Sequence, residues 1–175
     1  MNPDEQQHIL QTRAQTLAQE PAKPPAAAEL LTIIEFSLGT ERYGVPTACV
    51  REVHALRELT PLPGTPAFVL GIINVRGKII AVIDLKVLFR LSDKGLADHH
   101  KVIILQSADM ELGLLVDDVA GARAIRRTDL QPALPTLTGI RAEFLQGVTS
   151  ERLAVLDVVR LLADPKLIVH DEVQP

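Results

Sequence analysis

The stretch Ala81-Val82-Ile83-Asp84-Leu85, followed by Leu88, recurs later in the chain as Ala154-Val155-Leu156-Asp157-Val158, followed by Leu161. In each copy an aliphatic run typical of a buried strand ends at an aspartate, and apolar residues then follow at helical spacing. An aspartate at this place can cap the free amides of a helix. The sequence therefore predicts a repeated unit, a strand followed by a short capped helix.

Further echoes precede each copy, which is the pattern of an internal duplication. Phe68–Ile72 resembles Phe144–Val148 at an offset of 76 residues, whereas the strand-and-cap unit recurs at an offset of 73. The second copy is thus three residues shorter, and the deletion falls at a turn that carries Arg76 in the first copy. At an offset of 69 there are three matches: Ile33–Phe36 with Val102–Leu105, Tyr43–Val45 with Leu112–Leu114, and Val50 with Val119.

Short β-rich runs separated by Gly, Pro and Asp predict a mainly β body. The runs cover residues 31–38, 42–46, 69–75 and 78–83. The segment Asn74–Lys78 between two aliphatic strands predicts a tight hairpin with Arg76 at its tip. We expect two small β subdomains, at about 31–91 and 101–163, that pack together and leave a groove along their seam.

The two ends of the chain differ from this body. Apolar residues at helical spacing between residues 4 and 20 predict a short amphipathic helix, and the proline-rich segment 21–28 is typical of a linker. Residues 1–30 form the expected N-terminal extension, which is either a solvated segment or a docking element, and residues 164–175 form a C-terminal tail. The acidic N-terminus does not resemble an export signal, and the longest aliphatic stretch, Ile79–Ile83, is too short to span a bilayer. A cytoplasmic location is expected.

Composition excludes several function classes. The 175 residues include 18 Lys and Arg against 22 Asp and Glu, a formal net charge of −4, which disfavours nucleic-acid binding. Five aromatic residues without any Trp are too few for a base-stacking platform. Cys49 is the only cysteine, which excludes an internal disulfide, and we expect it to pack as a small buried side chain.

No constellation of residues predicts catalysis, a cofactor or a metal. Gly71–Lys78 lacks the spacing and the hydroxyl residue of a phosphate-binding loop, and no two histidines have the i, i+4 spacing of a helical metal site. The adjacent carboxylates of Asp117 and Asp118 point to opposite faces if they lie on a strand. Asp84 and Asp157 are explained as helix caps. The sequence predicts a protein that is not an enzyme.

Five segments carry a resemblance to a known family. The run Ile34–Gly39, the run Glu41–Pro46 and the run Val50–Val53 resemble the opening of CheW-like chemotaxis coupling proteins. The block Thr60–Gly77 resembles the signature of that family and is followed by Val82–Leu85. The resemblance covers about residues 31–163, and one departure is Val75, where the family usually has Leu.

The resemblance implies a fold of two five-stranded SH3-like barrels, each followed by a short helix. It also implies a non-enzymatic adaptor that joins the cytoplasmic tip of chemoreceptors (methyl-accepting chemotaxis proteins) to the regulatory domain of a CheA-type histidine kinase. Such an adaptor is cytoplasmic and is recruited to membrane-associated receptor arrays. The receptor-binding positions that match the family are Val50, Glu52, Gly71 and Arg76.

Two alternatives remain open. A CheW-like regulator of another pathway, such as twitching motility, has the same architecture and differs only in its partners. A small-ligand-binding β-barrel module would use a pocket at the seam between the two halves.

The charged residues Glu52 and Arg76 are expected to form hydrogen bonds to polar groups of a partner helix, while Val50 and Gly71 offer an apolar floor.

Overall fold

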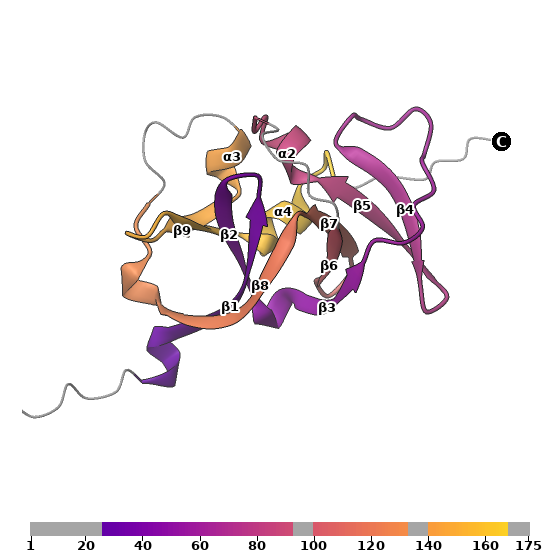
Figure 1. Cartoon of the computed structure of the whole chain (residues 1–175). Coiled ribbons are helices and arrows are strands. Elements are labelled where there is room, and N and C mark those ends of the chain that lie inside the picture. Colours follow the sequence, from indigo (N-terminus) through magenta and orange to yellow (C-terminus); the bar gives the residue numbers. More distant parts are fainter. Residues whose placement is uncertain (1–25, 93–99, 133–139, 168–175) are drawn as a thin grey trace, which may run out of the picture.

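The computed structural model describes residues 26–92, 100–132 and 140–167. Within these ranges ten strands form two five-stranded sheets, which we call barrel A and barrel B (Figure 1). The strands of barrel A, in spatial order, are β8 (Asp118–Arg126), β1 (Leu30–Leu38), β2 (Glu41–Pro46), β10 (Leu153–Leu156) and β9 (Leu145–Val148). Those of barrel B are β3 (Val50–Ala55), β6 (Lys101–Gln106), β7 (Glu111–Val116), β5 (Lys78–Asp84) and β4 (Val69–Val75).

Short helices connect these strands. The α-helices are α2 (Leu85–Leu88), α3 (Ile140–Glu143) and α4 (Val158–Ala163), and the 3₁₀ turns are η1 (Ala27–Glu29), η2 (Thr47–Cys49) and η3 (Arg127–Asp129). Helix α2 follows β5 and helix α4 follows β10, so a short helix follows the hairpin of each barrel. The mainly β prediction of two five-stranded SH3-like barrels is confirmed. The predicted helix at 4–20 lies outside the described residues.

The two barrels exchange strands between the halves of the duplication. Hairpin β1–β2 from the first half joins β8, β9 and β10 of the second half, and hairpin β6–β7 from the second half joins β3, β4 and β5 of the first. The orders β8-β1-β2-β10-β9 and β3-β6-β7-β5-β4 are the same when each strand is replaced by its counterpart. The sheets therefore do not coincide with the contiguous segments 31–91 and 101–163, since each half lends its first hairpin to the other.

Each lent hairpin forms a parallel strand pair with the barrel that it joins. Val155 of β10 lies opposite Gly44 of β2, and Val82 of β5 lies opposite Gly113 of β7. A Cβ atom on Gly44 would stand 2.6 Å from Ile33 Cδ1, and one on Gly113 would stand 2.8 Å from Val102 Cγ1. The two glycines make room for a neighbouring side chain at equivalent places, which explains why they recur at the 69-residue offset.

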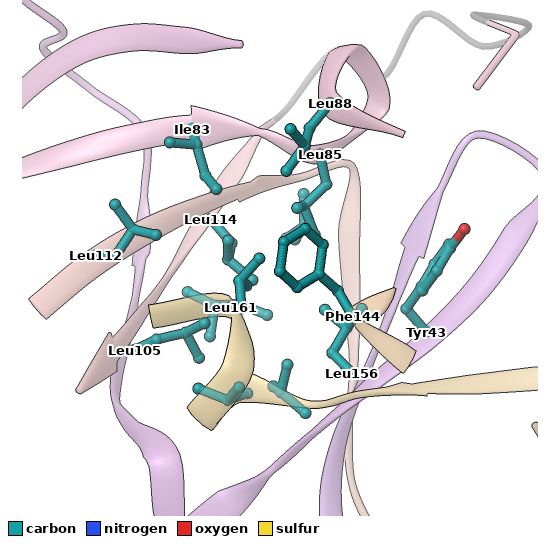
Figure 2. Packing of buried hydrophobic residues seen from close by; sticks show 14 of the residues in the cluster. Tyr43, Ile83, Leu85, Leu88, Leu105, Leu112, Leu114, Phe144, Leu156 and Leu161 are labelled. Carbon is teal, nitrogen blue, oxygen red and sulfur yellow. The ribbon is translucent and has the colours of Figure 1, made fainter. Parts of the chain in front are cut away.

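Strands that bury both faces account for the aliphatic runs in the sequence. On β6, Val102 and Ile104 face the interior of barrel B, whereas Ile103 and Leu105 face a larger cluster shared by the two sheets. Figure 2 shows this shared core, to which β2 and β10 contribute Tyr43 and Leu156. In the described residues it contains 22 buried side chains, against seven and five inside barrels B and A. Packing between the barrels is therefore the main source of hydrophobic stabilisation.

The predicted caps and turns are present. Asp84 Oδ1 accepts a hydrogen bond of 2.8 Å from the Lys86 amide, and Asp157 Oδ1 accepts one of 3.1 Å from the Arg160 amide. Arg76 forms the β4–β5 turn with φ +52°, and it is followed by Gly77 with φ +84°. Two consecutive residues with positive φ are the signature of a tight hairpin whose twist matches that of the strands.

A buried ion pair joins the two barrels. Lys86 Nζ of α2 donates to Asp117 Oδ1 at 2.8 Å, and both side chains are about nine-tenths buried. Asp117 Oδ2 also accepts from the amide of Gly39 in the β1–β2 turn at 2.6 Å. Asp118 instead pairs with Lys101 at 2.9 Å, so the adjacent carboxylates do diverge as predicted.

Candidate functional site

Strand β3 and the β4–β5 turn bring together two of the four predicted site residues. Arg76 Nη2 lies 3.3 Å from Glu52 Oε2, although β3 and β4 are the opposite edge strands of barrel B. The curvature of the sheet brings these two edges close to each other at this point. The Arg76 side chain is 76% exposed, whereas that of Glu52 is 17% exposed. The pair thus consists of a sheltered carboxylate and an arginine that reaches into solvent.

Two further bases surround the carboxylate, and we call Arg51, Glu52, His54 and Arg76 the Glu52 cluster. His54 Nε2 lies 3.1 Å from Glu52 Oε2, and Arg51 Nε lies 3.8 Å from Glu52 Oε1. The contact with His54 lowers the pKa of Glu52 most, burial opposes this effect, and the positive charges of Arg76 and Arg51 lower the pKa further. Glu52 is therefore ionised at neutral pH and holds Arg76 electrostatically.

A second carboxylate extends this row of charges. Glu111 Oε1 lies 2.7 Å from Arg51 Nη1, and Glu111 Oε2 lies 3.0 Å from Lys78 Nζ. The hydrogen bond from Lys78 lowers the pKa of Glu111 most, against the effect of burial, and Arg51 adds to the lowering. The sequence analysis did not find His54, Glu111 or Lys78. The sequence signal that could have found His54 is its i, i+2 spacing from Glu52, which places the two side chains on one face of a strand.

The other two predicted residues have different surroundings. Val50 begins β3 directly after Cys49 and packs, partly buried, against the shared core. Gly71 lies on β4 with φ +151°, and a Cβ atom there would overlap the Thr60 carbonyl oxygen. Thr60 and Ile72 exchange backbone hydrogen bonds of 2.9 and 2.8 Å. The chain itself therefore covers Gly71.

Two grooves flank these residues. The first, which we call the β3–β4 groove, has a volume of about 490 Å³ and lies between residues 54–58 and residues 73–76. The second, of about 770 Å³, lies beside Cys49 between the β6–β7 turn and α4, with Met110 and Leu162 in its wall. Burial raises the pKa of the Cys49 thiol most, and the negative charge of Asp157 adds to this effect. Cys49 packs against the shared core and is not an activated nucleophile.

Comparison with known proteins identifies the family. The model of the CheW-like domain matches residues 32–166. The chain belongs to the CheW-like domain family. It is 33% identical to the chemotaxis protein CheW of Treponema pallidum over 146 residues, which cover 79% of this chain and 86% of that protein. It is also 32% identical to the protein FrzA of Myxococcus xanthus, with coverage of 73% and 82%.

A solved CheW structure has the same fold. The crystal structure of the scaffolding protein TtCheW from Thermoanaerobacter tengcongensis matches with a TM-score of 0.65 and 35% sequence identity. The match covers 72% of this chain and 88% of that one. This CheW-like chain is an adaptor of the CheW type, as the sequence motifs predicted. In its described part no helix is long and apolar enough to cross a membrane, and no three His, Cys, Asp or Glu residues are placed to hold a metal ion.

Proposed function

We propose that this protein is a non-enzymatic adaptor that couples chemoreceptors to a CheA-type histidine kinase and is recruited to membrane-associated receptor arrays. Membership of the CheW-like family supports this proposal. The observation that carries it is the Glu52–Arg76 pair, which links β3 to the tip of the β4–β5 hairpin at an exposed position. Val50 and Arg76 would contact the receptor, Glu52 would orient Arg76, and the kinase regulatory domain would bind elsewhere on the protein.

The chemistry of the pair suits recognition of a receptor helix. A guanidinium has five N–H donors in a fixed fork, and one carboxylate oxygen of Glu52 cannot accept from all of them. Arg76 therefore keeps donors for a polar side chain or a carbonyl group of the partner. Glu52 fixes the direction of the arginine before binding, which reduces the entropy lost when the complex forms. In this proposal Glu52 is a positioning residue and Arg76 makes the contact.

Gly71 supports the same surface from inside the barrel. Because Gly71 has no side chain, Thr60 and Pro61 lie directly on β4 and hold the base of the hairpin that carries Arg76. We propose that Gly71 acts on receptor binding through the position of this hairpin and not through a contact of its own.

The test is the charge reversal Arg76→Glu, measured by binding to receptor cytoplasmic fragments and, separately, to the kinase regulatory domain. Loss of the charged hydrogen bonds should weaken receptor binding more than about tenfold, while kinase binding and the melting temperature stay nearly unchanged. Arg152→Glu is a matched control, because Arg152 lies in the β9–β10 turn with a similar φ of +63°.

A charge swap separates the roles of the two residues. If orientation by Glu52 matters, Glu52→Arg alone should weaken receptor binding, and the double variant Glu52→Arg/Arg76→Glu should not recover it, because the partner then meets an acid. Unchanged receptor affinity in Arg76→Glu, or equal loss for both partners, would refute the assignment of this surface to the receptor.

The similarity to FrzA supports a second candidate, a CheW-like regulator of a pathway other than chemotaxis. Such a regulator would have the same architecture and a different receptor and kinase. Copurification of partners from the native cell distinguishes the two candidates. Recovery of chemoreceptors with a CheA-type kinase supports the first, and recovery of the kinase and receptor of a surface-motility system supports the second.

A further inference from the structure

The β4–β5 hairpin has an uncovered edge that its counterpart lacks. In barrel A, Gln131 and Val148 exchange backbone hydrogen bonds of 3.0 and 2.8 Å, and β9 ends at Val148. In barrel B, Thr60 covers Ile72 in the same way, but β4 continues for three more residues to Val75. Across the whole hairpin the first copy of the sequence is three residues longer than the second. The extension therefore carries β4 beyond the segment that covers it.

Within the extension, the backbone N–H and C=O groups of Asn74 point away from β5. Ile72 bonds outward to Thr60, so Asn74, two residues further along the strand, also directs its N–H and C=O outward. Inside the hairpin, Ile73 lies opposite Ile80 and Val75 opposite Lys78. The edge of β4 at Asn74 is thus available for a further strand.

Strand β3, on the opposite side of the β3–β4 groove, presents a second free edge. The Leu56 amide donates to the His100 carbonyl at 3.0 Å, which fixes the alternation along β3: His54 and Leu56 bond toward β6. Val53 and Ala55 therefore direct their backbone groups away from β6. In the described part of the chain β3 pairs only with β6, and β4 pairs only with β5 and Thr60. Two unpaired edges face each other.

The β3–β4 groove lies between these two edges, and its own lining holds more basic than acidic side chains, while Glu52 at its end pairs with Arg76. Its lining includes Arg57 and Arg76 against one acid, Glu58, together with His54. At one end the Glu52–Arg76 pair, at 3.3 Å, spans from one edge to the other. An exposed edge strand is a template for another chain, and a peptide added to it gains main-chain hydrogen bonds.

We propose that the β3–β4 groove binds an extended, acidic segment of a partner protein, which adds as a further strand between β3 and β4. The free edges supply backbone hydrogen bonds at Val53, Ala55 and Asn74, and the two arginines favour carboxylates on the added strand. The backbone hydrogen bonds of this site do not depend on the proposed receptor contact, whereas Arg76 takes part in both. The three-residue extension of the hairpin is what creates it.

Binding is tested with two blocked pentapeptides, acetyl-Val-Asp-Val-Glu-Val-amide and its counterpart with Lys in place of both acids. Hydrogen exchange and amide chemical shifts of the full-length protein are measured by NMR with and without each peptide. The acidic peptide should slow exchange of the Val53, Ala55 and Asn74 amides, which are otherwise open to water, and the lysine peptide should bind about tenfold more weakly.

Ala55→Pro removes one outward N–H on the edge strand without removing a bond to β6, and it should weaken the acidic peptide about tenfold. Ala124→Pro is the matched control, since Ala124 holds the corresponding place on β8 of barrel A, opposite Thr32. It should leave peptide binding unchanged.

Arg57→Glu changes an exposed side chain outside every strand. This variant should reduce the preference for the acidic peptide even if a proline variant fails to fold.

Three outcomes overturn the proposal. The first is no binding of the acidic peptide at millimolar concentration. The second is protection that maps outside the groove, or equal binding by wild type and the Ala55→Pro variant. The third is concentration-dependent dimerisation of the free protein that Ala55→Pro abolishes, because a second copy of the chain would then occupy the groove.

Discussion

The β4–β5 and β9–β10 hairpins are two copies of one element that share the structure of their base and differ at their tips. At the base, the Asp84 amide donates to the Phe68 carbonyl at 2.8 Å, and the Asp157 amide donates to the Phe144 carbonyl at 2.7 Å. Each hairpin pairs in parallel with a strand lent by the other half. The shared features are those that the fold requires. The longer tip, with Arg76, is free to serve binding.

The ion pairs at the two hairpin tips also differ, because the acidic and basic partners are exchanged between the edge strand and the hairpin. In barrel B the edge strand supplies the acid Glu52 and the hairpin supplies the base Arg76. In barrel A the edge strand supplies the base Arg123, which lies 3.0 Å from Glu151 of the hairpin and 3.2 Å from Glu35. The hydrogen bond to Glu151 raises the pKa of Arg123 most. The same geometric task, holding a hairpin tip to an edge strand, is thus solved with opposite charges.

The largest effect is expected at the helices that follow the two hairpins. Lys86 of α2 and Val159 of α4 hold corresponding places, yet Lys86 is 8% exposed and Val159 is 70% exposed. Lys86→Met leaves Asp117 buried without its cation and should reduce the free energy of unfolding by about 3–5 kcal/mol. Val159→Lys should change it by less than about 0.5 kcal/mol. Denaturant titration of both variants checks this, and equal effects would contradict the contrast.

Substitution of the glycines at the base of the two hairpins should give a smaller difference in stability. Gly71→Ala places a Cβ atom on the Thr60 carbonyl at a φ that L residues rarely adopt, and about 3 kcal/mol of stability should be lost. At Gly147 the same atom would stand 2.9 Å from the Gln131 carbonyl oxygen, and the loss should be about 1 kcal/mol. Thermal unfolding of both variants measures the difference. A larger loss at Gly147 would show that the covering segments are not equivalent.

The caps test where the hairpins are alike. Asp84→Ala and Asp157→Ala each remove one side-chain acceptor from a short helix, so each should cost about 1 kcal/mol. Asp157→Ala should in addition shift the pKa of Cys49 back toward its ordinary value, because the charge of Asp157 contributes to its rise. Chemical denaturation and pH-dependent thiol alkylation measure the two effects. A cost of several kcal/mol at only one site would contradict equivalent capping.

The smallest effect concerns pH. Since the pKa of Glu52 is lowered in the folded protein, its contribution to stability is present above the ordinary value of 4.5 and is lost as the pH falls through the folded pKa. His54→Ala should raise this pKa more than Arg76→Ala does, because the His54 contact is the largest cause of the lowering. Carboxyl chemical shifts are followed by NMR over a pH range of about 2 to 7, which brackets carboxyl titration. They report which of the two variants raises the pKa of Glu52 more. The reverse order would show that Arg76 dominates the cluster.

Sequence patterns located most of the strands. The runs at 69–75 and 78–83 match β4 and β5 to within one residue, and Arg76 lies at the hairpin tip as predicted. These features are local, since side-chain alternation and turn chemistry depend on neighbours in the sequence. The Glu52–Arg76 contact was not predicted as a pair, because it depends on the curvature that brings two opposite edges of one sheet together.

The sequence by itself determined the duplication, the two capped helices, the three-residue difference between the hairpins and the family. Each of these is written in residue identity and spacing, which the chain carries whether folded or not. Only the tertiary structure decided that each half lends its first hairpin to the other, that Lys86 is buried on Asp117, and that Thr60 covers Gly71. Hydrogen-bond ladders and ion pairs between distant segments are selected by the packing of the whole core, so no local pattern specifies them.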